Sequence, residues 1–439
     1  MSLEILGLIL LGSLFVVILL GFPISFTLIF LALGFGYIGI GNRVFYLITY
    51  QYFETMMEPV LAAVALFTFM GYLLEGAGLM DRLFRALQLL SGHMKGSLYF
   101  ATIVTATLFA AATGIVGASV PILGLMAGPA MKRSGYNESL CAGTITAGGT
   151  LGILIPPSIM LVVMGPIMQL SVARLYAAAV LPGLLLASIY VIYTMIRVHL
   201  DPSSGPPLSD IELDVPLRYK IRELFVGLFP VATLIFACLG SILSGFATPT
   251  EGAAVGCLGA VLVALAQRRL NFGILKEAVL RTGVTTSMVM ILLAASTTVG
   301  AVFSAFGTPK FIADTLLTLD LPPGVFVLGI LVACFILGWP LEWIPIVVVI
   351  IPIFMPILIA LKVDMLWFAI LVAVILQSCW LSPPVALSAY YLKGVIPEWD
   401  LTLIYKGMIP FLGLQIIAVV LLYFFPQIIL LFPNLLFGR

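Results

Sequence analysis

The sequence predicts an all-α, polytopic membrane protein made of two inverted-topology repeats with discontinuous helices. Of its 439 residues, 62% are hydrophobic and only 9% are charged, with a mean hydropathy of +1.23. Soluble domains carry about 25% charged residues. Apolar runs of roughly 18 residues or more, long enough to cross a bilayer as a helix, recur along the chain. Two Pro-Pro pairs, at 156–157 and 383–384, interrupt such runs 227 positions apart (383 minus 156).

The expected spans follow the apolar runs. In the first half they cover residues 5–21, 23–39, 59–74 and 174–196, with a further apolar run at 98–111. In the second half they cover 224–244, 254–266, 285–306, 323–337 and 406–426. The N-terminus has neither a basic region nor a cleavage site, so we expect it to form a first transmembrane helix. With the broken helices, we expect about eleven full spans and two re-entrant helical hairpins.

The stretch from Gly148 to Ser158 holds three glycines and two prolines. In a helix interior Gly costs about 1 kcal/mol and Pro about 3 kcal/mol. Proline also forces the residue before it out of the α region. We therefore expect a helix to break near Ile155 and to restart at Pro157. Broken backbone at membrane depth is tolerated only where it is buried in protein or lines a cavity, which indicates a ligand site.

A second interrupted stretch, 378–388, and a second pair of helix-breaking patches, 112–121 and 338–345, share the offset of 227. Interrupted segments at corresponding positions of two halves are the best sequence indication of a transporter's binding site. The first repeat is expected at 1–198, with a hairpin at about 112–133 and a broken helix at about 138–170. A linker at 199–223 follows. The second repeat is expected at 224–439, with a hairpin at about 338–362, a broken helix at about 364–393 and a C-terminal span.

Basic residues concentrate in the turns at 82–95, 197–222 and 268–281. By the positive-inside rule these turns, including the linker, face the cytoplasm. The linker contains Pro, Ser and Gly together with charged residues, so we interpret it as a solvated tether and not as a partner-binding surface.

The Pro-Pro breaks place exposed helix N-termini inside the membrane. Such ends carry free N–H groups and a partial positive charge, which suit a carboxylate. The predicted substrate-binding residues are Pro156, Pro157, Ser158, Pro383, Pro384 and Ser388. Unwound carbonyls and nearby hydroxyls suit Na⁺, and the candidate cation ligands are Thr113, Gly114, Ser119, Thr150, Gly152, Gly338, Glu342, Ser378 and Ser382. The alternative is that each hydroxyl bonds back to its own helix.

Glu342 is an acidic residue among apolar neighbours, between Trp339 and Trp343. A carboxylate at the centre of a span costs roughly 2.5–3.5 kcal/mol on insertion scales, so it needs a partner. That partner is Na⁺, a proton or Lys310. The alternative is an interfacial residue at a wet hairpin tip.

Several function classes lack support. The net charge of +1 gives no basic field for nucleic acid. No GxxxxGK[ST] phosphate loop is present, so transport against a gradient needs an ion gradient or another subunit. The five cysteines and two histidines have no metal-ligand spacing, and no paired acids suggest catalysis. We expect a transporter without an organic cofactor. A membrane enzyme or a channel is the less favoured interpretation.

Several segments are recognisable together: the stretch 148–158 with Lys132 to Tyr136 before it, the segment 248–253, and the C-terminal segments 409–411 and 425–427. They resemble the large membrane subunit of tripartite ATP-independent periplasmic (TRAP) transporters. The resemblance covers essentially the whole chain. It implies an elevator-type fold of the ion-transporter superfamily in the bacterial inner membrane. It also implies Na⁺ symport of organic acids such as dicarboxylates. The expected partners are a small four-helix membrane subunit and a periplasmic substrate-binding protein. The alternative is a stand-alone ion-coupled organic-anion transporter.

Overall fold

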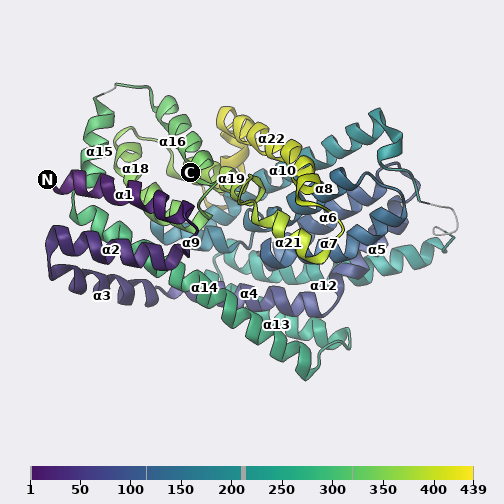
Figure 1. Ribbon diagram of the computed structural model, residues 1–439. Coiled ribbons are helices and arrows are strands. Elements are labelled where there is room, and N and C mark those ends of the chain that lie inside the picture. The colour runs from purple at the N-terminus through teal and green to yellow at the C-terminus, as the bar shows by residue number, and fades with distance from the viewer. Residues whose placement is uncertain (1, 115, 209–213, 319, 439) are drawn as a thin grey trace.

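The computed structural model describes residues 2–114, 116–208, 214–318 and 320–438, without the side chains of 111–113. Over these residues the protein is helical and contains no strand (Figure 1). Seven of the helices are at least 18 residues long and apolar enough to cross a membrane, and further apolar helices have 10–17 residues. The predicted all-helical membrane fold is confirmed. The expectation of about eleven full spans counted several of the shorter helices as complete crossings.

The first half contains α1 (Leu3–Leu19), α2 (Ile24–Ile40), α3 (Arg43–Met56), a 3₁₀ turn (Pro59–Leu61) with α4 (Ala62–Gly76), α5 (Leu79–Ser91), α6 (Ser97–Thr113), α7 (Val116–Arg133), α8 (Glu138–Thr150), α9 (Ile159–Met168) and α10 (Val172–Leu200). The second half contains α12 (Leu217–Leu243), α13 (Pro249–Ala266), α14 (Phe272–Ala305), α15 (Thr308–Leu317), α16 (Pro323–Leu337), α17 (Trp343–Pro345), α18 (Ile351–Ala360), α19 (Met365–Leu376), α20 (Ser378–Leu381), α21 (Leu387–Val395), α22 (Leu401–Phe424) and α23 (Gln427–Phe437).

The helix boundaries repeat at the same offset as the sequence motifs. Both ends of α7, 116 and 133, lie 227 positions before the ends of the α17–α18 stretch, 343 and 360. Asn137 and Asp364, also 227 apart, are the N-caps of α8 and α19. The side-chain oxygen of each cap accepts a hydrogen bond from a backbone N–H in the first turn of its helix, and that N–H would otherwise lack a partner.

The two halves are interlocked by reciprocal packing. α4 packs against α13, and its counterpart α14 packs against α2. α7 packs against α21, and α18 packs against α9; likewise α8 contacts α22 and α19 contacts α10. Each of these three contacts between the halves thus has a mate in which the roles are exchanged. This is the packing expected of two repeats related by a two-fold pseudo-symmetry axis.

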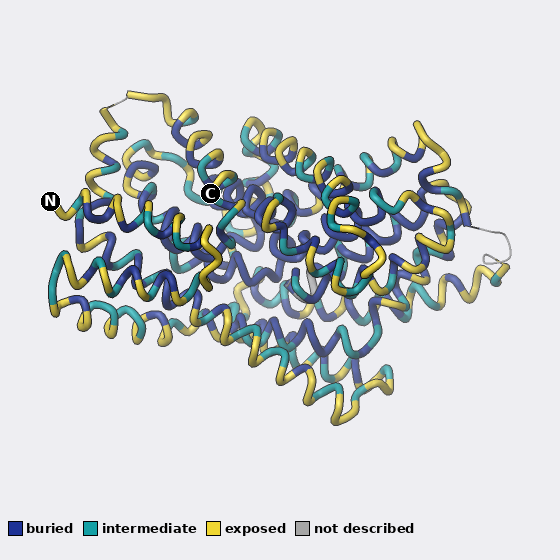
Figure 2. The backbone as a smooth tube through the Cα atoms, in the orientation of Figure 1, coloured by how far each residue is buried: buried dark blue, intermediate teal, exposed yellow. Residues whose placement is uncertain are grey.

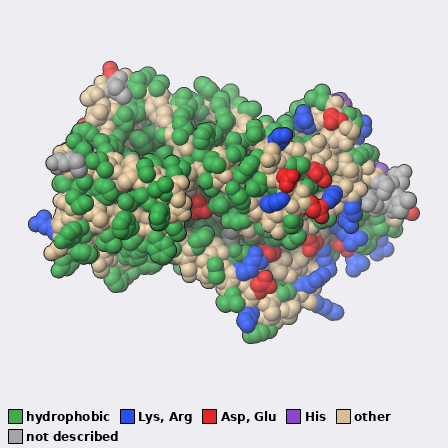
Figure 3. Space-filling model, in the orientation of Figure 1, with side chains coloured by type: hydrophobic (Ala, Val, Ile, Leu, Met, Phe, Trp, Pro, Cys, Tyr) green, Lys and Arg blue, Asp and Glu red, His purple; other side chains and the backbone are tan. Residues whose placement is uncertain are grey.

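The two broken helices lie at the centre of the molecule. All residues from Leu140 to Thr150 of α8 and from Phe368 to Leu376 of α19 are buried. A helix that is buried on every side belongs to the core, and Figure 2 shows the buried backbone running through this region. In Figure 3 the charged side chains gather over the end that holds α5 and α12, whereas the surface around α1–α3 is mostly hydrophobic.

Each hairpin consists of two helical arms, and the predicted hairpin ranges contain only one of them. α6 ends at Gly114, which has a left-handed φ of +62°, and α7 packs back along α6. In the second half α16 is the outer arm and α18 packs back on it. The range 323–337 was predicted as a full span because it is uninterruptedly apolar. At 15 residues, α16 is shorter than the ~20 residues of a full crossing.

The linker also differs from the prediction. α10 continues to Leu200 and α12 begins at Leu217, so the connection is 201–216 and not 199–223. Its first part is not a solvated tether, because the backbone of Gly205 and Leu208 bonds to that of Gly96 and Gly92, at 2.8 and 3.0 Å. Ser204 O accepts from the Asn137 N–H and from the Tyr99 hydroxyl. The connection therefore clamps the base of the α6–α7 hairpin to the start of α8.

Helices α8 and α22 meet through two glycines without intervening side chains. A methyl group at Gly407 would overlap the carbonyl oxygen of Ser139, and one at Gly143 would overlap that of Gly407. Such small-residue contacts allow close backbone approach between membrane helices. Because the obstructing atoms are backbone, only a shift of a whole helix relieves the overlap.

We therefore expect Gly407→Ala to destabilise the protein by about 1–3 kcal/mol through overpacking. Gly413→Ala, on the same helix with no atom within 4 Å, is the matched control. It should be neutral or slightly stabilising, because Ala favours a helix. Thermal unfolding of the purified variants in detergent measures both. Equal melting temperatures for the two variants would contradict the close contact.

Candidate functional site

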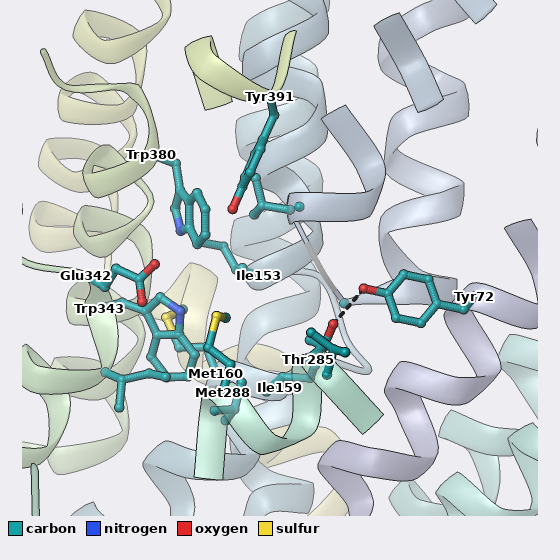
Figure 4. Close-up of a pocket in the computed structure, with 16 residues that line it drawn as sticks. Tyr72, Ile153, Ile159, Met160, Thr285, Met288, Glu342, Trp343, Trp380 and Tyr391 are labelled. Atoms are coloured by element: carbon teal, nitrogen blue, oxygen red, sulfur yellow. Dashed lines mark hydrogen bonds between the residues drawn. The ribbon is translucent and has the colours of Figure 1, made fainter. Parts of the chain in front are cut away.

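A cavity of about 250 Å³ lies where both hairpin tips and both helix breaks meet the helices α4 and α14. Gly114, Val116 and Gly117 come from the first hairpin, and Glu342, Trp343 and Ile344 from the second. The breaks contribute Ile153, Ile159, Met160, Trp380 and Tyr391, and the two long helices contribute Tyr72, Val284, Thr285, Met288 and Val289. Glu342 and Trp343 lie across the cavity from the Tyr72–Thr285 pair (Figure 4). A cavity at this junction fits the expectation that broken backbone surrounds a ligand.

The first break is closed by its own side chains. After α8 a 3₁₀ turn (Leu151–Ile153) leads to the cis Pro156-Pro157 bond, and Ser158 is the N-cap of α9. The Ser158 hydroxyl donates to Ile153 O and accepts from Leu161 N, at 3.4 Å for the latter. The helix therefore restarts at Ile159, two residues later than predicted, because Ser158 takes the capping position. Its hydroxyl serves the helix end, as in the alternative interpretation.

The tip of the first hairpin rests on this break. A methyl group at Gly114 would stand 3.0 Å from Pro157 O and 3.7 Å from the Ser158 Cα. Glycine supplies the positive φ and leaves room for this contact. Of the other candidates here, Thr150 donates to Ala147 O at 2.8 Å, and Ser119 and Gly152 are buried. The side chain of Thr113 lies outside the described residues.

The second break is less completely satisfied. α19 and α20 lead to the cis Pro383-Pro384 bond, and α21 starts after Ala386, which offers no side-chain cap. The Ser388 hydroxyl donates to Trp380 O. The backbone N–H groups at the start of α21 thus lack the side-chain acceptor that Ser158 gives to α9.

Four buried polar groups around this break have no hydrogen-bond partner among the described residues. They are the amide of Gln377, the hydroxyls of Ser378 and Ser382, and the indole N–H of Trp380. Both serines are only 1% exposed and Gln377 is fully buried. An unpaired buried polar group costs about 1–3 kcal/mol, so a cluster of them needs an explanation such as a missing ion or water. Gly338, the remaining candidate, packs closely on the thiol of Cys379.

Glu342 is the only charged residue among the described residues that line the cavity. It also lines a second cavity of about 190 Å³ with Trp380, Val385 and Leu387, at the start of α21. Lys310 is on α15 and lines a different cavity, between α15 and α18. A Glu342–Lys310 pair, one of the three partners considered for Glu342, is not among the ion pairs of the described chain.

Sequence reasoning placed Gly114 and Glu342 at the cavity, and Ser378 and Ser382 beside it. The prolines themselves and Ser158 do not line it. It missed Tyr72, Thr285 and Tyr391, whose side chains supply most of the neutral polar lining. Tyr72 and Thr285 bond to each other at 2.8 Å across α4 and α14. Tyr72 stands in an apolar run, whereas Thr285 stands beside Thr286 and Ser287. Neither context distinguishes a cavity residue from its neighbours.

Residues 11–428 match the family described as "Tripartite ATP-independent periplasmic transporter, DctM component". The chain is 32% identical over 385 residues to the C4-dicarboxylate TRAP transporter large permease protein of Pseudomonas aeruginosa, covering 87% of this chain and 88% of that one. It is 29% identical over 423 residues to the sialic acid TRAP transporter large permease protein of Vibrio cholerae, covering 95% and 96%.

A solved structure shows the same fold. The crystal structure of the Alcanivorax borkumensis YdaH transporter superimposes with a TM-score of 0.62 over 88% of this chain and 89% of that one, at 16% sequence identity. The family match over nearly the whole chain agrees with the apolar helices and with an inner-membrane location. The chain belongs to the DctM family, the large membrane subunits of tripartite ATP-independent periplasmic transporters.

Proposed function

We propose that this chain carries a small organic acid across the inner membrane by symport with Na⁺. The observation that carries the proposal is the cavity at the junction of both hairpin tips and both helix breaks, with unpaired polar groups beside it. Relatives are named for C4-dicarboxylate and for sialic acid, and both ligands are carboxylic acids. The shared chemistry is therefore a carboxylate, and the uncapped N-terminus of α21 is a favourable place for it.

The Na⁺ site is proposed at the second break. Ser378 and Ser382 are one helical turn apart, at the start and the C-cap of the short helix α20, and Gln377 precedes them. Three buried side-chain oxygens without a partner among the described residues therefore lie just before the Pro383-Pro384 bond. Hard cations prefer such oxygen ligands together with backbone carbonyls. A bound Na⁺ would satisfy these oxygens. Glu342 would supply a negative charge for this site, since it lines the same small cavity as Cys379 and Trp380 of α20.

The proposed mechanism is an elevator. The two hairpins and two broken helices pack on one another across the pseudo-symmetry axis, so they can move as one unit. α2, α4, α13 and α14 pack on one another and form the scaffold. Na⁺ orders the second break, the carboxylate then docks at α21, and the unit moves across the scaffold. A small four-helix membrane subunit would bind the scaffold, and a periplasmic binding protein would deliver the acid.

Reconstitution tests this directly. We expect proteoliposomes to take up a radiolabelled organic acid only when the chain is combined with its small membrane subunit and binding protein, under an inward Na⁺ gradient. A panel including succinate and sialic acid identifies the acid. Uptake by this chain alone would instead support a stand-alone transporter. Uptake with partners but without dependence on Na⁺ would contradict the cation site and favour proton coupling.

The unpaired hydroxyls give a sharper test of the Na⁺ site. Ser378→Ala and Ser382→Ala should leave the stability of the Na⁺-free protein unchanged or slightly raised, because each removes an unsatisfied group. Each should weaken Na⁺ binding about tenfold, the equivalent of roughly 1.4 kcal/mol. Thermal unfolding titrated with NaCl against choline chloride measures both effects.

Ser296→Ala is the matched control, since Ser296 is fully buried on α14 and its hydroxyl donates to Leu292 O at 2.7 Å. It should lower stability equally with and without Na⁺. An unchanged Na⁺ response in both Ser378→Ala and Ser382→Ala would remove these residues from the site.

The hairpin tip gives a further prediction. Gly114→Ala should impair transport severely, because a methyl group at φ +62° also presses on Pro157 O. Gly135→Ala is the control, since Gly135 has a φ of +72° with no atom within 4 Å. Both changes should cost about 1–2 kcal/mol of stability from the left-handed conformation. Uptake measurements then separate them: equal uptake by both variants would show that the tip contact has no role in transport.

A further inference from the structure

Another cavity, of about 140 Å³, lies between α4 and α14 and shares Tyr72 with the main cavity. Its walls include Tyr72 and Glu75 on α4 and Ala278 and Arg281 on α14. Tyr72 lines both cavities, so its ring is a shared wall. This α4–α14 cavity lies outside the junction of hairpins and helix breaks described above.

Arg281 lies behind that wall. The carbon at the centre of its guanidinium is 4.3 Å from the centroid of the Tyr72 ring, which is a cation–π contact. Its Nη1 donates to Glu75 Oε1 at 2.7 Å, and the exposed Glu277 carboxylate is 3.8 Å away. Among the described residues that line either cavity, Arg281 is the only cationic one.

The register of the two helices sets two polar pairs one above the other. Tyr72 bonds to Thr285 at the main cavity, and Glu75 bonds to Arg281 one turn further along. Residues three or four apart share a helix face, so the step between the pairs is about 5 Å. This step leads toward the C-terminal end of α4 and the basic turn at 268–281, where the positive-inside rule places the cytoplasm.

The Glu75–Arg281 ion pair uses only one oxygen of the Glu75 carboxylate. The other oxygen, Oε2, is buried without a partner in the described structure. The Glu75 side chain is 18% exposed and that of Arg281 38%. A guanidinium has five donors in a planar fork, which matches both oxygens of a carboxylate. The single contact leaves donors of Arg281 that a second carboxylate can use.

We propose that Arg281 and Tyr72 form a second carboxylate-binding subsite on the cytoplasmic side of the main cavity. Glu75 is the internal carboxylate that occupies the guanidinium until the transported acid displaces it. The acid leaves a cavity in which Glu342 is the only charged residue among the described lining residues, and it passes to the Arg281 guanidinium one helical turn away. When the acid departs, Glu75 returns to Arg281. This inference rests on the proposed function, since it takes the ligand to be an organic acid.

Equilibrium binding of sodium succinate to the full chain in detergent tests the subsite. Sodium chloride at the same Na⁺ concentration is the reference. Glu75→Gln frees the guanidinium and should lower the apparent Kd for succinate by about fivefold, on the scale of one charge-assisted contact. The gain should vanish in the double variant Glu75→Gln/Arg281→Gln. Arg281→Lys, which keeps the charge without the fork, should bind more weakly than the native chain.

Glu277→Gln is the matched control, because it removes the same charge near Arg281 from an exposed position without freeing the guanidinium. It should leave the Kd unchanged. An equal decrease of the apparent Kd for succinate in Glu277→Gln and Glu75→Gln would show that the loss of any nearby negative charge is enough, and would contradict the subsite. The subsite would also be contradicted if the lower Kd for succinate persisted in the double variant, or if Glu75→Gln did not lower the Kd. The ion pair would then have only a structural role.

Uptake by the same variants, reconstituted in proteoliposomes with the small membrane subunit and the binding protein, separates this inference from the proposed function. Glu75→Gln should slow net uptake and retain exchange against internal succinate, because tighter binding on the cytoplasmic side delays release. Absent Na⁺-driven uptake in the native chain contradicts the proposed function. Normal uptake together with an unchanged Kd in Glu75→Gln contradicts the subsite alone.

Discussion

The structure depends on one constraint: every backbone polar group within an apolar medium must find a partner inside the protein. A continuous helix meets this constraint alone, whereas a broken helix does not. The protein therefore buries both breaks at its centre and places a hairpin tip and neighbouring helices around them. The first break meets the requirement internally, since the Ser158 hydroxyl bridges Ile153 O and the start of α9. The second break leaves the side chains of Gln377, Ser378 and Ser382 without a partner in the described part of the chain.

The two breaks differ although they occupy equivalent positions of a repeated architecture. The two halves share helix boundaries, N-caps and packing partners, so each break leaves polar groups that need partners. Side chains of the first break supply such partners. In the second break the side chains of Gln377, Ser378 and Ser382 have no partner among the described residues. The glycine contact between α8 and α22 joins the two halves through their backbones.

Much of the fold could be predicted from the sequence, because prolines and glycines act locally. The offset of 227, the helix breaks and the pairing of Asn137 with Asp364 all follow from backbone rules that need no tertiary information. The hairpin arms were harder, since α16 has the composition of a span and only its length argues otherwise. The candidate site was partly predictable: Glu342 is conspicuous among apolar residues, whereas Tyr72 and Thr285 reach the cavity only because α4 and α14 cross there. The linker clamp depends on backbone hydrogen bonds, which leave no trace in composition.

The clamp formed by residues 201–208 makes the two halves of the molecule unequal, although their repeats are related by a two-fold axis. A two-fold arrangement offers the same path in both directions, and the gradients across the membrane alone then decide the direction of net flow. Residues 201–208 fasten the base of the first hairpin, whereas the equivalent positions 428–435 belong to α23, which packs on α10. The bases of the two hairpins are therefore held by different contacts. If the hairpins and broken helices move as one unit, as proposed, this asymmetry leaves the final accumulation ratio unchanged but allows the rates of loading and release to differ between the two faces of the membrane.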